Sequence, residues 1–229
     1  IENNIGVTIY RNTNNGAVTN NIVAFIEDNL GNCTITNNRG TNIKNNQIPS
    51  AIIGNNVNEI TGNILSGGAA GILNNVGNVI SDNTHYGNIE ENNVIRIKSN
   101  VSASPTASGI FGNVGYQIES NTAFEAISFN NVRKIFLNDV IQIINENNGH
   151  IIAACSNFNS IANNAINSIT ATVGSLSLPS ILECIGLRLE SCTINNGGLV
   201  RCNINYIISC IFDTSGGGGA ATIFDHTFI

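Results

Sequence analysis

The feature that most constrains the fold of this chain is an Asn-Asn pair, usually followed by Val or Ile, that recurs about every eighteen residues. The pairs begin at Asn3, Asn20, Asn37, Asn55, Asn74, Asn92, Asn130, Asn147, Asn163 and Asn195. Other turn-forming residues complete the period, namely Gly112-Asn113, Pro179-Ser180 and Asp213-Thr214. Successive positions lie 16 to 20 residues apart over the whole chain. A period this regular predicts a solenoid with one structural unit per repeat.

A second line of asparagines follows the pairs by seven to nine residues: Asn12, Asn29, Asn46, Asn63, Asn83, Asn100, Asn121, Asn138 and Asn157, resuming at Asn203. Ile and Val, which favour strands, lie between the two lines, whereas Asn suits short corners because it tolerates the left-handed conformation. Stacked amides can also hydrogen-bond along the axis. We therefore predict one all-β domain over residues 1–229, a parallel β-helix of about 12–13 coils of 16–20 residues with Asn ladders at the turns.

The coil pattern also resembles that of a known superfamily. Residues Asn74 to Asn83 read Asn-Asn-Val-x-x-x-Ile-x-x-Asn, and this is similar to the coils of the right-handed, pectate-lyase-like β-helices. The uneven coil length favours the right-handed form too, because left-handed β-helices repeat a strict hexapeptide. This superfamily includes lyases, glycosidases, virus tailspikes and adhesins, so the resemblance implies an architecture and leaves the function open.

Composition excludes some classes of partner. Charged residues make up 10% of the chain, and the net charge is −6. Because no run of Lys and Arg is present to neutralise phosphates, we expect no nucleic-acid partner. No apolar run is long enough to span a membrane, so no membrane span is expected. Neither end of the sequence shows a polar capping coil, which predicts a segment of a longer fibre or ends covered by neighbouring chains.

The six cysteines follow the period as well. Cys184 and Cys202 are eighteen residues apart, as are Cys192 and Cys210. We expect reduced, inward-facing thiols that act as small apolar residues in the core. Cross-coil disulfides are the alternative, but directly stacked side chains point in parallel and fit that bond poorly. The three histidines are too far apart in sequence for metal-ligand spacing, so neither a metal nor another cofactor is predicted.

Aligning the coils on the Asn pairs brings five polar residues into one outward stripe. The third residue after the pair is, in successive coils, Glu59, Asn78, Arg96, Tyr116 and Lys134. A glycosidase needs two carboxylates close together, and this stripe has one, so no catalytic residue is predicted. Tyr and Arg suit the binding of a glycan or a protein partner. A slip of one residue in the alignment would move a member to another side of the coil. Two longer coils predict bulges in their last third, at Leu65–Gly71 and Val101–Gly109, and insertions of this kind often collect on a binding face. The alternative is that their small Gly, Ala and Ser residues only allow close packing between chains.

The leading functional hypothesis is a non-enzymatic structural or receptor-binding segment of an extracellular or virion fibre, resembling tail fibres and tailspikes. That resemblance implies a homotrimer, with end-to-end contacts between chains as the alternative. A surface glycan is a possible ligand. Two other functions stay open: a polysaccharide lyase or glycosidase that uses the stripe, and a bacterial surface adhesin passenger. The stretch FDTSGGGGA, from Phe212 to Ala220, resembles the Phe and Gly-Gly-Ala motifs of β-helical adhesins.

Overall fold

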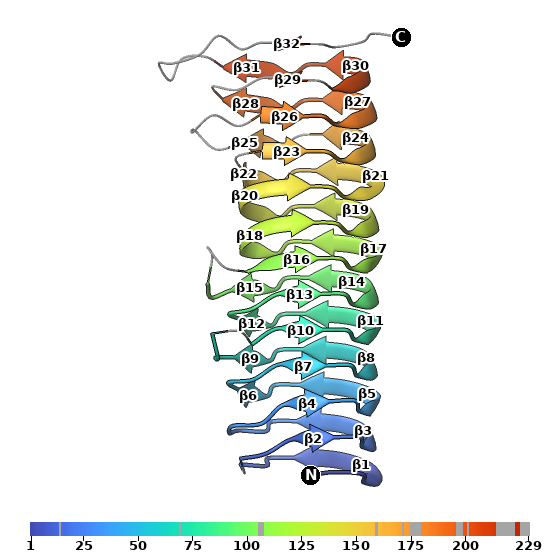
Figure 1. The fold of residues 1–229 in the computed structure, drawn as a ribbon, viewed down its shortest axis with the longest axis vertical. Helices are drawn as coiled ribbons and strands as arrows, with labels where there is room; N and C mark the ends of the chain where they lie inside the picture. Colours follow the sequence, from blue (N-terminus) through green and yellow to red (C-terminus); the bar gives the residue numbers. More distant parts are fainter. Residues whose placement is uncertain are drawn as a thin grey trace.

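The computed structural model describes residues 1–229 except 14, 69, 105–107, 159, 171, 175–179, 196–198, 201, 214–222 and 225–229. The described chain is a parallel β-solenoid, and none of its elements is a helix (Figure 1). All strand pairings between its elements are parallel, which confirms the predicted β-helix with stacked Asn corners. The residues of the Gly216–Gly219 run lie outside the described part.

One sheet contains twelve long strands, one per coil and stacked in chain order. They are β1 (Ile5–Tyr10), β3 (Ile22–Glu27), β5 (Arg39–Lys44), β8 (Asn56–Thr61), β11 (Val76–Ser81), β14 (Asn93–Lys98), β17 (Val114–Glu119), β19 (Asn131–Phe136), β21 (Asn148–Ala153), β24 (Ala165–Thr170), β27 (Ile185–Glu190) and β30 (Asn203–Ile208). Each has six residues, so this side of the solenoid is uniform along its length.

The second sheet consists of two columns of mostly short strands. The column after the long strands is β6 (Gln47–Ile48), β9 (Ile64–Leu65), β12 (Thr84–His85), β15 (Val101–Ser102), β22 (Ser156–Phe158), β25 (Val173–Gly174), β28 (Thr193–Asn195) and β31 (Ile211–Asp213). The column before them is β2 (Val18–Thr19), β4 (Ile35–Thr36), β7 (Ile52–Ile53), β10 (Ile72–Leu73), β13 (Ile89–Glu90), β16 (Gly109–Phe111), β23 (Ser160–Ala162), β26 (Ser180–Leu182), β29 (Leu199–Val200) and β32 (Ile223–Phe224). The longer β18 (Thr122–Ser128) and β20 (Asp139–Asn145) join both columns.

Two amide ladders run along the axis, one at each end of the long strands. We call the asparagines before the strands the first ladder, of which all but Asn4 are buried: Asn4, Asn21, Asn38, Asn55, Asn75, Asn92, Asn113, Asn130, Asn147 and Asn164. Those after the strands are the second ladder: Asn12, Asn29, Asn46, Asn63, Asn83, Asn100, Asn121 and Asn138. The predicted stacking of asparagines is therefore present twice in each of the first eight coils.

Each ladder asparagine satisfies backbone groups that the corner turns into the interior. The backbone N–H and the side-chain amide of Asn38 both donate to Oδ1 of Asn55, at 2.9 and 3.0 Å. The Asn38 amide also donates to the carbonyl of Val18 at 2.9 Å. Because a buried backbone group without a partner costs free energy, the asparagine side chain stabilises the corner.

The residue before each ladder residue has a positive φ, between 49 and 66° where the structure describes it. Asn often takes this place, as at Asn20 and Asn37, but so do Glu91, Phe129 and Leu137. In some Asn pairs the ladder residue is therefore the second member, as at Asn74-Asn75. In others it is the first, as at Asn92-Asn93. The pair marks the corner to within one residue only.

Measured between ladder residues, the coils are more regular than the pairs predict. The step from the first to the second ladder is eight residues in every coil, from Asn4–Asn12 to Asn130–Asn138. Most coils have 17 residues; longer steps of 20 and 21 residues follow Asn55 and Asn92, and steps of 20 and 18 residues follow Asn164 and Cys184. The extra residues after Asn55 and Asn92 lie between the short strands, where bulges are predicted at Leu65–Gly71 and Val101–Gly109.

The core is formed by stacked aliphatic side chains from facing sheets. The fifth residues of the first eleven long strands are all buried: Ile9, Ile26, Ile43, Ile60, Ile80, Ile97, Ile118, Ile135, Ile152, Ile169 and Leu189. The fifth residue of β30, Ile207, is partly buried against them. The other sheet contributes Val18, Ile35, Ile52, Ile72, Ile89, Ile110, Ile127, Ile144, Ile161 and Ile181, all fully buried. Stacks of one residue type pack well because each side chain meets an identical neighbour in the next coil.

The second residue of the long strands alternates between Gly and a β-branched residue, which gives the solenoid a period of two coils. The order is Gly6, Val23, Gly40, Val57, Gly77, Val94, Gly115, Val132, Gly149, Ile166 and Gly186. At Gly40 a Cβ atom would lie 1.8 Å from the carbonyl oxygen of Val23. Only glycine therefore fits on top of the β-branched residue of the preceding coil.

Candidate binding surface on the long sheet

The strand register divides the predicted stripe into two neighbouring columns. Glu59, Arg96 and Lys134 share one column, in which Val79 and Gln117 alternate with them. Asn78 and Tyr116 precede Val79 and Gln117 by one residue, so the prediction of a single stripe is wrong for these two. The cause is the pair itself, because the first asparagine is the ladder residue before Glu59 and the second is the ladder residue before Asn78.

The two columns nevertheless lie on the same surface. In β14 the second and fifth residues, Val94 and Ile97, are buried, whereas the third and fourth, Ile95 and Arg96, are exposed. A regular strand would turn one of these two inward, so the long strand bends here and leaves adjacent residues facing solvent. Glu59, Asn78, Arg96 and Tyr116 are accordingly exposed, and Lys134 is half-buried. The offset of one residue therefore places Asn78 and Tyr116 in the neighbouring column, and their side chains stay exposed.

Basic and aromatic side chains gather on three successive strands of this surface. We call Arg96, Lys98, Tyr116, Arg133 and Lys134 the basic patch; they belong to β14, β17 and β19. The guanidinium carbon of Arg133 lies 5.4 Å from the centroid of the Tyr116 ring, within range of a cation–π contact. The patch holds four of the nine Lys and Arg residues of a chain with a net charge of −6. It can attract an anionic ligand to an otherwise acidic rod.

A surface depression of about 400 Å³ adjoins the basic patch at Lys134. Its other lining residues, which we call the alanine hollow, are Phe136, Leu137, Ile151, Ala153, Ala154 and Thr170. The hollow forms because Ala153 is stacked in register on the larger Phe136. An apolar floor beside a lysine suits a ring that carries an anionic group. Sequence reasoning did not identify this hollow, since it depends on which residues stack.

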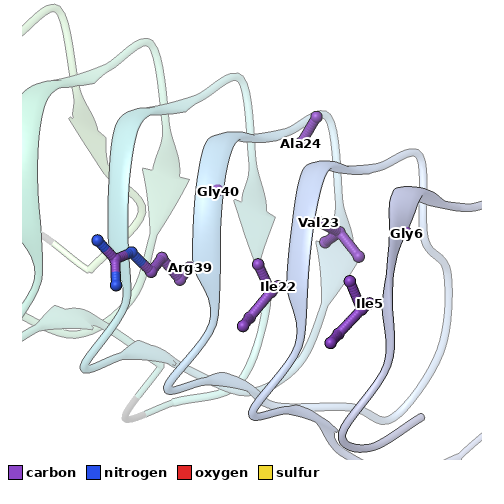
Figure 2. Close-up of a pocket in the computed structure, with 7 residues that line it drawn as sticks. All are labelled: Ile5, Gly6, Ile22, Val23, Ala24, Arg39 and Gly40. Carbon is purple, nitrogen blue, oxygen red and sulfur yellow. The ribbon is translucent and has the colours of Figure 1, made fainter.

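Other depressions on this sheet follow the glycine alternation. One of about 360 Å³ is lined by Ile5, Gly6, Ile22, Val23, Ala24, Arg39 and Gly40. Figure 2 shows Ile5, Ile22 and Arg39 projecting from three successive strands of this depression. A second, of about 370 Å³, has the same arrangement around Gly149, Ile166 and Gly186. Because they recur with the backbone period, these depressions belong to the architecture of the sheet.

One titratable residue lies inside the core. His85 of β12 is fully buried; its Nδ1 lies 2.8 Å from the carbonyl oxygen of Gly87, and its Nε2 has no hydrogen-bond partner. Its ring centroid is 5.3 Å from that of Phe124. Burial lowers the pKa of His85 to about 4, so the ring is neutral at physiological pH. His85 is a core residue and does not contribute to the basic patch.

The cysteines occupy a place that the sequence analysis did not predict. Five of the six stand at ladder positions: Cys184 and Cys202 in the first ladder, and Cys155, Cys192 and Cys210 in the second. The second asparagine line therefore ends at Asn138, and the predictions that it continues at Asn157 and returns at Asn203 are wrong, since Asn203 begins β30 directly after Cys202. Cys33, Cys155, Cys184, Cys192 and Cys202 are buried, as predicted, and Cys210 is half-buried. All six are free thiols.

Within the described residues, no group of three or more His, Cys, Asp or Glu side chains is arranged to hold a metal ion. None of the described segments is a helix that could cross a membrane. Comparison with known proteins finds no matching family model, no matching curated protein and no matching solved structure.

Proposed function

We propose that this chain is a non-enzymatic structural and receptor-binding segment of an extracellular or virion fibre. The observation that carries the proposal is the pair of amide ladders, which run side by side from Asn4 and Asn12 through the first eight coils. The ladder amides of each coil donate to side-chain oxygens of the next coil, so bending or opening a coil leaves buried amides unpaired. A stiff rod with a uniform long side is suited to a shaft.

The basic patch is the proposed binding surface, and an anionic glycan is the proposed ligand. Arg96 and Lys134 stand in one column two coils apart, about 10 Å at the usual strand spacing. This distance is close to the length of a disaccharide unit in an extended polysaccharide. A chain that lies along the rod axis and carries one acidic group per disaccharide would meet both cations. The Tyr116 ring and the alanine hollow offer apolar surfaces for the sugar rings.

Association with further copies of the chain belongs to the same proposal. The first residues of several long strands are apolar and exposed, with Ile5 at 84%, Ile22 at 53%, Val76 at 48%, Val114 at 49% and Ile185 at 65%. Such residues could pack between rods in a trimer, and end-to-end contacts are the alternative. Sedimentation measurements on the purified chain would distinguish a trimer from a chain of variable length.

Two alternative functions make different demands on the surface. A polysaccharide lyase or glycosidase would use Glu59, whose column neighbours are Asn42 and Val79. Lys134 is four coils away, about 20 Å, which is a long distance for two groups acting on one bond. An adhesin passenger is the other alternative, and most of its FDTSGGGGA motif falls outside the described residues.

The test is to incubate the protein with acidic and neutral polysaccharides, measuring both binding and polysaccharide chain length. We expect acidic polysaccharides to bind without shortening. Replacing Arg96 and Lys134 together with Ala should weaken binding about tenfold or more, because each charged contact contributes about 1 kcal/mol. Shortened chains would favour the enzymatic alternative, and equal binding of neutral polysaccharides would contradict the role of charge.

The chain offers a matched control for the aromatic part of the patch. Arg11 lies 4.6 Å from the ring of Tyr10, in the same type of contact as Arg133 and Tyr116 but outside the basic patch. Ala is tolerated at the position of Arg11, because Ala154 takes the same place, with positive φ, before Cys155. We therefore expect Arg133→Ala to weaken glycan binding and Arg11→Ala to leave it unchanged.

A further inference from the structure

The last coils contain two stacked pairs of cysteines in the places where earlier coils carry ladder asparagines. Cys184 is followed by Cys202 in the first ladder, and Cys192 by Cys210 in the second. Asparagine suits these places in the earlier coils because its amide bonds three groups at once. Thr172 holds the place before Cys192, so the corner accepts more than one small polar residue. Small size and polarity therefore do not explain why cysteine occurs at these places in two adjacent coils.

The backbone holds Cys192 and Cys210 at a separation compatible with a covalent bond. The strands that follow them pair in register, with Thr193 opposite Ile211. The N–H of Ile211 donates to the carbonyl of Cys192 at 2.8 Å. Their Cα atoms are therefore about one strand spacing apart, roughly 4.8 Å, which falls inside the range seen for disulfides. Parallel side chains are a poor starting geometry, so one thiol has to rotate to reach the other.

The two thiols of this pair differ in exposure. Cys192 is fully buried, whereas Cys210 is half-buried and accessible to a reagent. Cys192 is held by Thr172, whose hydroxyl donates to its Sγ at 3.3 Å, and its own thiol reaches the carbonyl of Glu190 at 3.3 Å. The Cys210 thiol lies 3.4 Å from the carbonyl of Ile208. A reagent therefore meets Cys210 first, with Cys192 directly behind it.

The electrostatics agree with this order. The thiol of Cys192 donates to the sulfur of Cys210, and this hydrogen bond lowers the pKa of Cys210 to about 6 despite the opposing effects of burial and of Glu190. The same hydrogen bond, together with burial, raises the pKa of Cys192. Of the two thiols, Cys210 is therefore the one that loses its proton more readily. A thiolate at the surface with a second thiol beside it is the arrangement of reactive cysteines that form disulfides.

We propose that Cys192 and Cys210 form a thiol–disulfide exchange site that reacts with low-molecular-weight disulfides. The Cys210 thiolate attacks one sulfur of the small disulfide; that S–S bond breaks, a mixed disulfide forms on Cys210, and one small thiolate leaves with the electron pair. Cys192 then gives its proton to the first small thiolate and attacks Cys210 Sγ; the S–S bond of the mixed disulfide breaks, and the second small thiolate leaves with the electron pair and takes a proton from water. Two protein thiols are oxidised to one disulfide between adjacent coils, and one small disulfide is reduced to two thiols.

The other stacked pair provides an internal control in the same fold. Cys184 and Cys202 are each 2% exposed, so neither can meet a reagent while the coil is folded. Hydrogen bonding to Cys202 and burial raise the pKa of Cys184, which keeps it protonated. Cys33 is also buried, and burial raises its pKa. These three residues should therefore react slowly.

The experiment uses the full reduced chain, iodoacetamide and glutathione disulfide, with peptide mass mapping under non-reducing conditions. We expect iodoacetamide to alkylate Cys210 at least about tenfold faster than Cys184, Cys202 or Cys33, because Cys210 is half-buried and has a lowered pKa, whereas the other three thiols are buried. Glutathione disulfide should produce the peptide linked through Cys192 and Cys210. Equal alkylation rates, or a failure to form this linked peptide, would overturn the proposal.

A variant separates the roles of the two thiols. Cys192→Thr places at this corner the residue that the previous coil already uses, so the coil should fold. In this variant, Cys210 should retain glutathione as a stable mixed disulfide, because the resolving thiol is gone. Cys184→Thr is the control and should still form the Cys192–Cys210 disulfide. Release of glutathione from Cys192→Thr as fast as from the unchanged chain would show that Cys192 does not resolve the mixed disulfide.

Discussion

The coils with asparagine ladders and the later coils with cysteines form the same corner with different hydrogen bonds. In the second ladder, Asn100 donates to Asn121 Oδ1 at 3.0 Å and to the carbonyls of Ile80 and Lys98 at 3.1 and 2.9 Å. Cys155, at the equivalent place, reaches the carbonyls of Ile135 and Ala153 only at 3.9 and 3.5 Å. The backbone path is unchanged, as the positive φ of Ala154 shows. The corner therefore forms with either small inward side chain, but a side-chain amide makes the stronger hydrogen bonds that stabilise it.

The largest expected effect comes from removing one ladder amide. Asn100→Ala deletes the three bonds above and also leaves the N–H and amide of Asn83 without their acceptor, at 3.1 and 2.9 Å in the native chain. We expect a loss of about 4 kcal/mol in the free energy of unfolding, measured by urea denaturation. Cys155→Ala should cost only about 1 kcal/mol. Equal losses for the two variants would contradict the idea that a ladder asparagine stabilises its corner more than a cysteine does.

Acid should destabilise the asparagine-ladder region through His85. The folded-state pKa of about 4 lies below the usual value of 6.5, so the unfolded chain binds the extra proton between these pH values. Stability is therefore complete above pH 6.5 and falls as the pH drops towards 4, by about 3 kcal/mol. Thermal melts from pH 7 to pH 4 would measure this loss. His85→Leu, which repeats the stacked neighbour Leu65, should flatten that part of the profile.

The glycine alternation continues through both regions and separates backbone effects from ladder effects. A Cβ on Gly77 would lie 1.9 Å from the carbonyl oxygen of Val57, and one on Gly186 would lie 2.5 Å from that of Ile166. Gly77→Ala should cost about 2–3 kcal/mol, and Gly186→Ala less. Gly6 has nothing within 4 Å of such a Cβ, so Gly6→Ala is the control and should be nearly neutral in thermal melts. A large loss at Gly6 would contradict the steric explanation.

The smallest expected effect is a gain. Cys155→Asn extends the second ladder by one coil, because the new amide can accept from Asn138 and donate to the carbonyls that the thiol reaches poorly. We expect about 1 kcal/mol of added stability, seen as a higher melting temperature. A lower melting temperature would show that the corner at Ala154 has adapted to a thiol and no longer fits an amide.

The sequence predicted which residues lie on the candidate surface, but it did not predict which column of the sheet each one occupies. Arg96, Tyr116 and Lys134 are exposed or half-buried on successive long strands, as the pattern predicts. Their columns could not be assigned, because an Asn pair looks the same whether its first or second member is the buried one. A usable signal was present, since the constant step of eight residues between the two ladders points from Asn147 to Cys155 and not to Asn157.

The sequence by itself determined the architecture: a regular period of Asn corners and Ile or Val strands can bury its apolar residues only by stacking coils. The sequence also determined that charged and aromatic residues are few, so that a cluster of them on one surface is a candidate binding site. The tertiary structure decided which asparagine of each pair turns inward and where the long strands bend. It also decided that cysteines replace amides in the last coils. These features depend on single backbone torsions and on contacts between residues about 17 apart, which a pattern of residue types does not specify to within one position.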